Sequence, residues 1–376
     1  SQQVVNRPYQ ETSSRVSGSE IISSNSKTSY NGNYGLNASW TLYNGNKRLK
    51  TIQQEKLNNQ VAELDVATSE NNIQESIAQV YIQILYAAES VKVNESTLQV
   101  SIAQRDRGQE LLNAGSIAKS DFAQLEAQVS TDRYQLVTAQ ATLEDYKLQL
   151  KQLLELDGEN EMNIYLPALS DENVLAPLPT KKDVYISALS LRPEIEASKL
   201  NVEASELGIG IAKSSYLPTI SLSAGIGTNH TSGSDFTFGE QVKNGWNNSI
   251  GLSVSVPIFN NRQTKSAVQK AKLQYETSML SLLDEQKTLY KTIEGLWLDA
   301  NSAQQRYAAA NEKLKSTQIS YELISEQFNL GMKNTIELLT EKNNLLQAQQ
   351  EQLQAKYMAI LNTQLLKFYQ GDQLAL

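Results

Sequence analysis

Three short stretches of the chain alternate between apolar and polar residues. This period of two predicts β-strands with one apolar face, and the intervening residues are mostly Ser, Gly, Asn and Thr. The alternation fits half-buried strands of a soluble sheet and also lipid-facing strands of an outer-membrane barrel. Three such strands in a chain with little other β signal favour the barrel. The residues expected to face lipid are Leu36, Ala38, Trp40, Leu42, Ile220, Leu222, Ile250, Leu252, Val254 and Val256.

Long helices are predicted after the strands. Stretches 45–113 and 262–329 contain no proline, and the seam that begins at Ile293, Leu296 and Ala300 alternates steps of three and four, as in a coiled coil. A helix of about 67 residues spans about 100 Å, far more than a globular core needs. A glycine follows each helix, and returning helices are predicted over about 117–156 and 334–368. The fold class is therefore mostly α with a small β part.

The chain is an internal duplication. Tyr34–Asn44 aligns with Ile250–Asn260, and the same offset of 216 positions aligns Asn113–Gly115 with Asn329–Gly331. By this logic the first repeat should have a further helix and strand before residue 1, so we expect that most of them are absent and that 3–9 is a remnant strand. The predicted segments are 1–44 (strands), 45–156 (first hairpin), 157–215 (linker and one helix), 216–260 (strand pair) and 261–370 (second hairpin).

The small number of predicted strands in each chain bears on how a barrel could be assembled. Three or four strands cannot close a barrel, and lipid tolerates no open sheet edge. The smallest single-chain barrels have about eight strands. Several copies must therefore combine if these strands face lipid, and three copies of four strands would give twelve.

Several short motifs, taken in this order, resemble the TolC family of outer-membrane efflux proteins. Leu191–Ile195 resembles its "(R/N)PE(I/L)" helix start, and Tyr216–Ile220 its "YLPxL" entry into a strand. Val256–Asn260 is similar to the strand-to-helix corner, and Phe328–Gly331 with Glu337–Leu339 resembles the helical tip. The resemblance covers essentially the whole chain.

The resemblance implies a homotrimer in the outer membrane of a Gram-negative cell. Each protomer would contribute to a β-barrel in outer-membrane lipid, a periplasmic α-helical tunnel and an equatorial domain. The trimer would act as the exit duct of a tripartite efflux pump or type I secretion system. Its partners would be a periplasmic adaptor (membrane fusion) protein and an inner-membrane pump of the RND, ABC or MFS type.

The resemblance also places functional residues at the helix tips. In the family, the entrance is narrowed by a basic residue two positions past the tip glycine and by acidic residues nearby. The matching positions of this chain are Lys333, Glu337 and Asp121. We expect Lys333 to pair with Asp121 of an adjacent hairpin and Glu337 to ring the pore. Solvated charges at an exposed helix end are the alternative. The other candidate constriction residues are Phe328, Thr340 and Glu341.

Adaptor docking is expected at the two turns, whose glycines permit close approach of another backbone. The simpler alternative is that these glycines only end helices. The candidate docking residues are Asn113, Ala114, Gly115, Ser116, Asn329, Leu330, Gly331 and Met332.

Composition narrows the functional classes further. The absence of cysteine excludes disulfides and thiol catalysis, and a net charge of −8 argues against nucleic acid as a partner. No convergent polar cluster predicts an enzyme, a cofactor or a metal site. A coiled-coil surface stalk would explain the heptads but not the strands, and a porin not linked to a pump would explain the strands but not the hairpins. The exported cargo and the pump class stay open.

Overall fold

A computed structural model describes residues 2–6, 13–17, 19–24, 28–156, 164–165, 174–232, 234 and 236–374. These residues form two compact units, the first made of 1–59 and 201–279 and the second of 60–200 and 280–376. Within the predicted segment 157–215, the structure describes 164–165 and 174–215.

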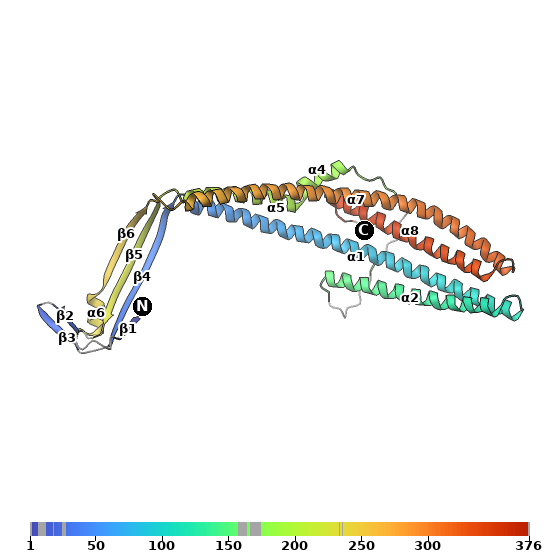
Figure 1. Ribbon diagram of the computed structural model, residues 1–376, viewed down its shortest axis with the longest axis horizontal. Coiled ribbons are helices and arrows are strands. Elements are labelled where there is room, and N and C mark those ends of the chain that lie inside the picture. The colour runs from blue at the N-terminus through green and yellow to red at the C-terminus, as the bar shows by residue number, and fades with distance from the viewer. Residues whose placement is uncertain are drawn as a thin grey trace. The chain divides into compact units, whose positions relative to one another are not determined.

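The first unit contains a four-stranded antiparallel sheet with the order β1-β4-β5-β6 (Figure 1). Its strands are β1 (Gln2–Asn6), β4 (Thr28–Asn44), β5 (Thr219–Thr231) and β6 (Asn247–Ser255). Part of the stretch 3–9, where a strand was expected, lies in β1, and residues 7–9 lie outside the described part. Three elements were not predicted from the sequence: the hairpin of β2 (Ser13–Ser17) with β3 (Glu20–Ser24), and the short helix α6 (Phe238–Asn244).

The register of the sheet places the apolar residues in cross-strand rows. Trp40 lies opposite Leu222, which lies opposite Leu252 on the third strand. Directly opposite residues share a face, so one face is apolar. The neighbouring row on the other face is Ser39, Ser223 and Gly251. The alternation expected from the sequence is therefore present in the paired strands.

Two details of the strands differ from the sequence expectation. A register shift between Thr41 and Tyr43 places Tyr43, not Leu42, opposite Ile220, so Leu42 lies at an irregularity of β4. Val256 lies just beyond β6, which ends at Ser255. The next residue is proline, which has no N–H for the ladder.

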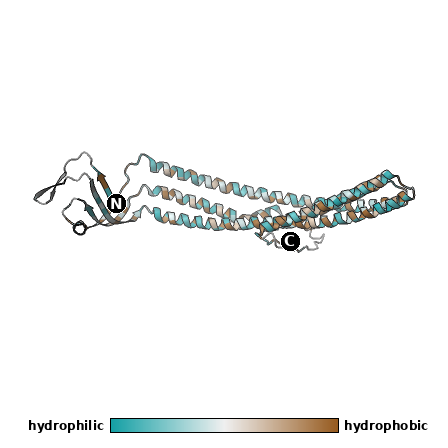
Figure 2. Cartoon of the chain, turned by 90° about the horizontal axis from the view of Figure 1, so that it is seen from below, coloured by the Kyte–Doolittle hydropathy of each residue, from teal (hydrophilic) through white to brown (hydrophobic). Residues whose placement is uncertain are grey.

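The long helices repeat with the offset seen in the sequence. α1 (Lys47–Asn113) and α7 (Gln263–Asn329) each have 67 residues, and their starts and ends are 216 positions apart. The return helices α2 (Lys119–Leu153) and α8 (Thr335–Gln370) also start 216 positions apart. Apolar and polar residues mix along all of them (Figure 2). In the described part, no helix combines the length and apolar character needed to cross a bilayer.

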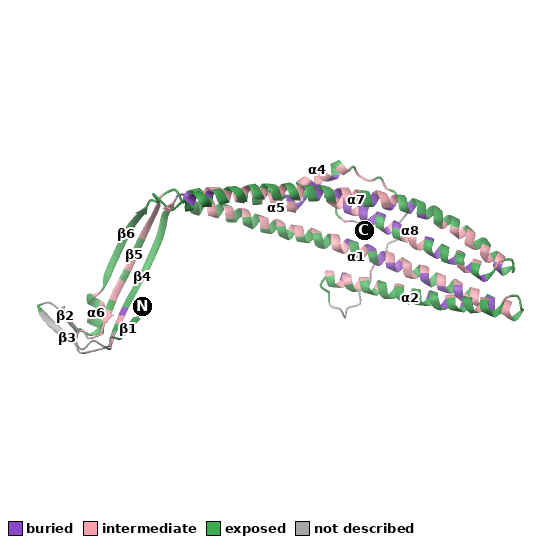
Figure 3. Ribbon diagram, in the orientation of Figure 1, coloured by how far each residue is buried: buried purple, intermediate pink, exposed green. Residues whose placement is uncertain are grey.

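Two clusters of buried apolar residues form most of the core of the second unit, and they combine residues of the long helices with residues of α4 and α5 (Figure 3). One cluster contains Ile82 of α1, Tyr307 of α7 and Ile360 of α8. The other includes Val184 of α4 (Lys181–Leu191) and Ile195 of α5 (Pro193–Ser214). The sequence predicted α5 but not α4, because α4 follows the prolines that marked a linker.

Arg192 lies between α4 and α5 and makes buried polar contacts with neighbouring helices. Its side chain is 7% exposed, and its guanidinium donates to Glu194 at 2.8 Å and to Glu75 of α1 at 3.2 Å. It also lies 4.2 Å from the ring centre of Tyr369 in α8. Burial raises the pKa of Glu75, while Arg192 opposes that shift. One arginine therefore joins α1, α5 and α8.

Candidate functional site: the helix tips and the buried cluster above them

Both hairpin turns use a left-handed glycine to end the first helix. Gly115 has φ +74° and Gly331 has φ +73°. At the first turn, the N–H of Ser116 donates to the carbonyl of Leu111 at 2.8 Å, and the second turn repeats this bond between Met332 and Gln327. A Cβ built on either glycine would meet nothing within 4 Å. Within the chain, backbone conformation alone therefore requires these glycines.

The two tips differ in the side chains they expose. The second tip presents Leu330 at 75%, Met332 at 71% and Ile336 at 61% exposure. The matching positions of the first tip are Ala114, Ser116 and Ser120, which are small. Exposed apolar surface at the tips is therefore concentrated on the second hairpin.

Lys333 and Glu337 form a local cap at the start of α8. The side chain of Asn334 accepts from the N–H of Glu337 at 2.9 Å, and one Glu337 oxygen accepts from the N–H of Asn334 at 3.2 Å. The other Glu337 oxygen binds the ammonium of Lys333 at 2.6 Å. The Lys333 bond, followed by the Asn334 N–H, lowers the pKa of Glu337. Within the chain, Glu337 thus stabilises the start of α8, and Lys333 is its ion-pair partner.

Asp121 is not the partner of Lys333 within this chain. Its carboxylate accepts from the N–H of Ala118 at 3.4 Å, at the start of α2. A Lys333–Asp121 pair between hairpins of different copies stays a prediction. Thr340 is exposed and donates to the carbonyl of Ile336, and Glu341 accepts from Ser320 of α7 at 3.1 Å.

Phe328, one of the candidate constriction residues, is buried within this chain, and its place at a constriction of an assembled channel stays a prediction. Its side chain is 2% exposed and packs with Leu125 of α2 and Leu338 of α8. Burial of the apolar aromatic side chain of Phe328 at this seam position is favoured by the hydrophobic effect. Phe328 therefore belongs to the core of the tip and does not line an opening in this structure.

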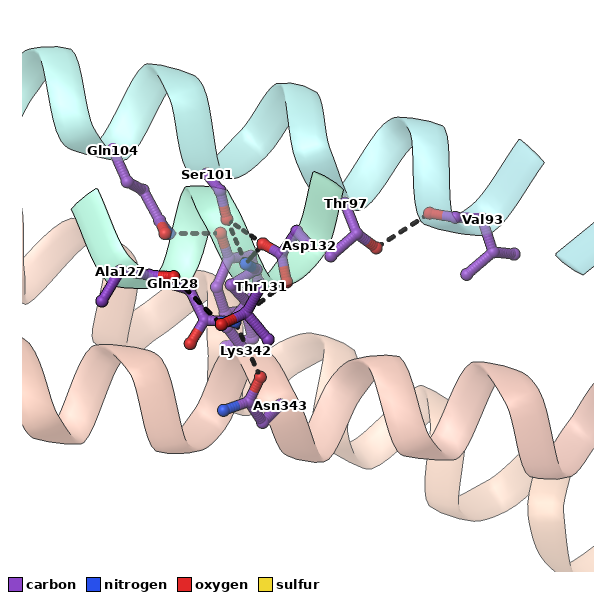
Figure 4. Close-up of polar contacts among 11 residues, drawn as sticks. Val93, Thr97, Ser101, Gln104, Ala127, Gln128, Thr131, Asp132, Lys342 and Asn343 are labelled. Carbon is purple, nitrogen blue, oxygen red and sulfur yellow. Dashed lines mark hydrogen bonds and ion pairs between the residues drawn. The ribbon is translucent and has the colours of Figure 1, made fainter. Parts of the chain in front are cut away.

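A buried polar cluster lies above the tip, and the sequence analysis missed it (Figure 4). The ammonium of Lys342 in α8 binds Asp132 of α2 and Ser101 of α1, and Ser101 also donates to Asp132. The side chains of Lys342 and Asp132 are 3% and 1% exposed. Gln128 donates to the second Asp132 oxygen at 2.9 Å. Burial lowers the pKa of Lys342, and the bond to Asp132 opposes that shift.

The sequence did carry a signal for this cluster. Lys342 stands between Leu338 and Leu345 at steps of four and three, which is a seam position. Asp132 follows Val129 at the same kind of position on α2. Opposite charges at seam positions of two different helices indicate a buried pair that fixes how the helices associate.

Comparisons with known proteins agree with this architecture. Residues 8–155 and 184–371 match the family described as outer membrane efflux protein. Over 294 residues the chain is 24% identical to outer membrane efflux protein BepC of Brucella suis biovar 1 (strain 1330), covering 78% of this chain and 61% of BepC. Over 311 residues it is 23% identical to outer membrane protein TolC of Escherichia coli (strain K12), covering 80% of this chain and 62% of TolC.

The fold is similar to the solved structure of CusC. The TM-score is 0.79 at 20% identity, and the match covers 99% of this chain and 84% of the CusC chain. The TolC-like fold expected from the sequence is thereby confirmed. The chain spans about three fifths of the length of BepC and TolC. Because the family match covers most of its residues, the chain belongs to the outer membrane efflux protein family.

Proposed function

We propose that this chain is one protomer of a trimeric exit duct in the outer membrane, serving an efflux pump or a type I secretion system. The observation that carries the proposal is that one chain contains both a sheet with an apolar face and two helical hairpins whose first helices have 67 residues each. Neither a surface stalk nor a porin that works without a pump accounts for both features.

The sheet supports a membrane position that is shared between copies. Ile250, Leu252 and Trp40 are 84%, 66% and 63% exposed, although they lie on the apolar face. Exposing such a row to water is unfavourable by about 25 cal/mol for each Å² of apolar surface, so lipid is the suitable solvent. The four described strands leave two sheet edges, which copies of the chain would pair to close a twelve-stranded barrel.

The tips support contact with a periplasmic adaptor. Leu330, Met332 and Ile336 form an apolar surface at the second turn, where water would otherwise hydrate it. The open space around Gly115 and Gly331 leaves room for a partner backbone at both turns. An adaptor served by an inner-membrane pump would dock there.

The same tips would form the gate. Three copies of Glu337 around a narrow entrance would favour cations and repel anions. A link from Lys333 to Asp121 of a neighbouring copy would require Lys333 to leave Glu337, to which it is bound at 2.6 Å. Lys333→Ala and Asp121→Ala should raise single-channel conductance if the link exists, and unchanged conductance of both variants would reject it.

The overall proposal is tested with the full-length protein in a planar lipid bilayer. We expect a detergent-solubilised trimer that gives stepwise conductance when added to the bilayer. The protein should also restore export in a host that lacks its own outer-membrane duct. A monomer that is freely soluble without detergent and gives no conductance would refute the proposal.

A further inference from the structure

The strand-to-helix junctions of the first unit lie together at one edge of the sheet. Asn44 at the end of β4 pairs with Thr219 at the start of β5, which pairs with Ser255 at the end of β6. α1 and α7 begin shortly after β4 and β6, and α5 ends shortly before β5. Lys50 of α1 also donates to the carbonyl of Gly210 in α5 at 3.4 Å. Three helix ends therefore meet the same edge of the sheet.

This edge is basic, although the chain as a whole is acidic. The stretches 45–57, 205–218 and 256–272 contain nine lysines and arginines but only two glutamates, whereas the whole chain has a net charge of −8. All nine cations except the partly exposed Lys50 are exposed. None of the nine forms an ion pair with an acidic residue in the described part of the chain. We call them the basic collar: Lys47, Arg48, Lys50, Lys56, Lys213, Arg262, Lys265, Lys270 and Lys272.

The starts of the two long helices differ from the starts of the other helices. α2, α4, α5, α6 and α8 each have an acidic residue in the first turn, which suits the positive end of a helix dipole. α1 and α7 have no acidic residue there and carry Lys47, Arg48 and Lys265 in its place. Cations at this end of a helix are unfavourable within the chain. Their presence indicates that negative charge outside the chain balances them.

The duplication shows what kind of negative charge this is. The positions 216 residues after Lys47 and Arg48 are Gln263 and Thr264, and the counterpart of Lys265 is Leu49. Both repeats are therefore basic at the sheet edge, but with the cations at different positions. A contact with one fixed acidic side chain would require matched positions. A diffuse anionic surface requires only that cations are present at the right level.

Exposed apolar side chains lie between the strands and the basic collar. Ile258 and Phe259 connect β6 to α7 and are 94% and 82% exposed, and Leu217 connects α5 to β5 and is 44% exposed. Along the chain, they follow or precede strands whose apolar face suits lipid. Lysine and arginine side chains are long enough to reach charged headgroups while their stems remain beside apolar groups. An apolar band bordered by cations is thus typical of a surface that passes from acyl chains to headgroups.

We propose that the basic collar binds the anionic headgroups of phospholipids in the periplasmic leaflet of the outer membrane. The group that it recognises is a phosphodiester with a net negative charge, as in phosphatidylglycerol. Attraction between exposed charges falls off over a Debye length of about 10 Å at 0.1 M salt, so cations far from the sheet edge do not contribute. The inference rests on the membrane position proposed for the sheet and adds the class of lipid that this position selects.

The relative association of two lipids with the protein tests this contact. Full-length protein is placed in phosphatidylcholine bilayers that contain a trace of spin-labelled phosphatidylglycerol or spin-labelled phosphatidylcholine. The motionally restricted fraction of each probe gives its association with the protein. For the wild type we expect phosphatidylglycerol to be favoured about threefold or more in about 0.05 M NaCl, and the ratio should approach one in about 1 M NaCl because salt screens the charges.

Two variants separate the basic collar from the overall charge of the protein. The collar variant should lose most of the preference for phosphatidylglycerol; it carries Lys47→Gln, Arg48→Gln, Arg262→Gln and Lys265→Gln. The matched control removes the same number of exposed cations outside the collar and should keep the wild-type preference; it carries Lys119→Gln, Arg133→Gln, Lys287→Gln and Lys315→Gln.

The possible results distinguish this inference from the proposed duct. A wild-type protein that inserts and conducts but associates equally with both lipids would overturn the inference and leave the duct intact. A preference that the collar variant keeps, or that the control variant loses to the same extent, would also overturn it. If the collar variant does not assemble, the wild type still decides, because a preference unchanged in about 1 M NaCl contradicts recognition by charge. A wild-type protein that inserts into no bilayer would overturn both proposals.

Discussion

The buried pair of Lys342 and Asp132 gives the sharpest stability prediction. Lys342→Met keeps the length of the side chain but leaves Asp132, 1% exposed, without its cation. Removing one member of a buried ion pair costs about 3–5 kcal/mol, because the remaining charge stays desolvated. Replacing both members by apolar residues, as in Lys342→Met with Asp132→Leu, should recover most of that loss. The pair should therefore show strong coupling in a double-mutant cycle.

Thermal unfolding of the purified trimer, followed by circular dichroism at several detergent concentrations, measures this effect. The single variants should lower the midpoint by on the order of 5 °C, and the double variant should lie within about 2 °C of the wild type. Lys313→Met is the matched control, because the Lys313–Glu351 pair is 43% and 42% exposed. Exposed pairs contribute about 0–1 kcal/mol. Equal midpoints for Lys342→Met and the wild type would refute the reasoning.

Three further predictions concern the junction and the second tip. Arg192→Met should destabilise the protein by about 3 kcal/mol, because it leaves two largely buried carboxylates without their cation, and unfolding midpoints measure this. Glu337 has a lowered pKa, so its contribution to the start of α8 is present above its unfolded pKa of about 4.3 and lost as pH falls through the folded value. The protection factors of that turn against hydrogen exchange, which are corrected for the intrinsic rate at each pH, should therefore fall in acid, and Glu337→Gln should remove this dependence. Leu330→Ser with Met332→Ser should weaken adaptor binding at least tenfold in a pull-down with unchanged trimer, whereas unchanged binding would place the docking surface elsewhere.

The sequence was sufficient for the long elements because their signals are periodic. A repeat of three and four steps identified α7, and the absence of proline together with the repeat offset identified α1. The tip glycines Gly115 and Gly331 marked their ends. The alternation in β4, β5 and β6 was equally clear, since the face of a residue follows from its position in a strand. α4 and α6 were missed because short helices beside prolines or glycines have little periodic pattern.

The candidate site was harder to predict because side-chain partners depend on which helices meet. Phe328 could face the opening or the core, and the packing of Leu125 and Leu338 decides for the core. Lys342 occupies a seam position of α8, but its spacing alone does not show which helix supplies its partner, which the structure identifies as Asp132 of α2. The resemblance located the tip residues Lys333 and Glu337, but it could not show that they bind each other within one helix turn.

Divergence between the two repeats explains how a duplicated chain would specify three copies. A ring of alternating hairpins has two kinds of seam, one within each chain and one between chains. The counterpart of Lys342 in the first repeat is Glu126, and the counterpart of Asp132 in the second is Ala348, so the buried pair cannot form twice. That pair joins α2 and α8 within the chain.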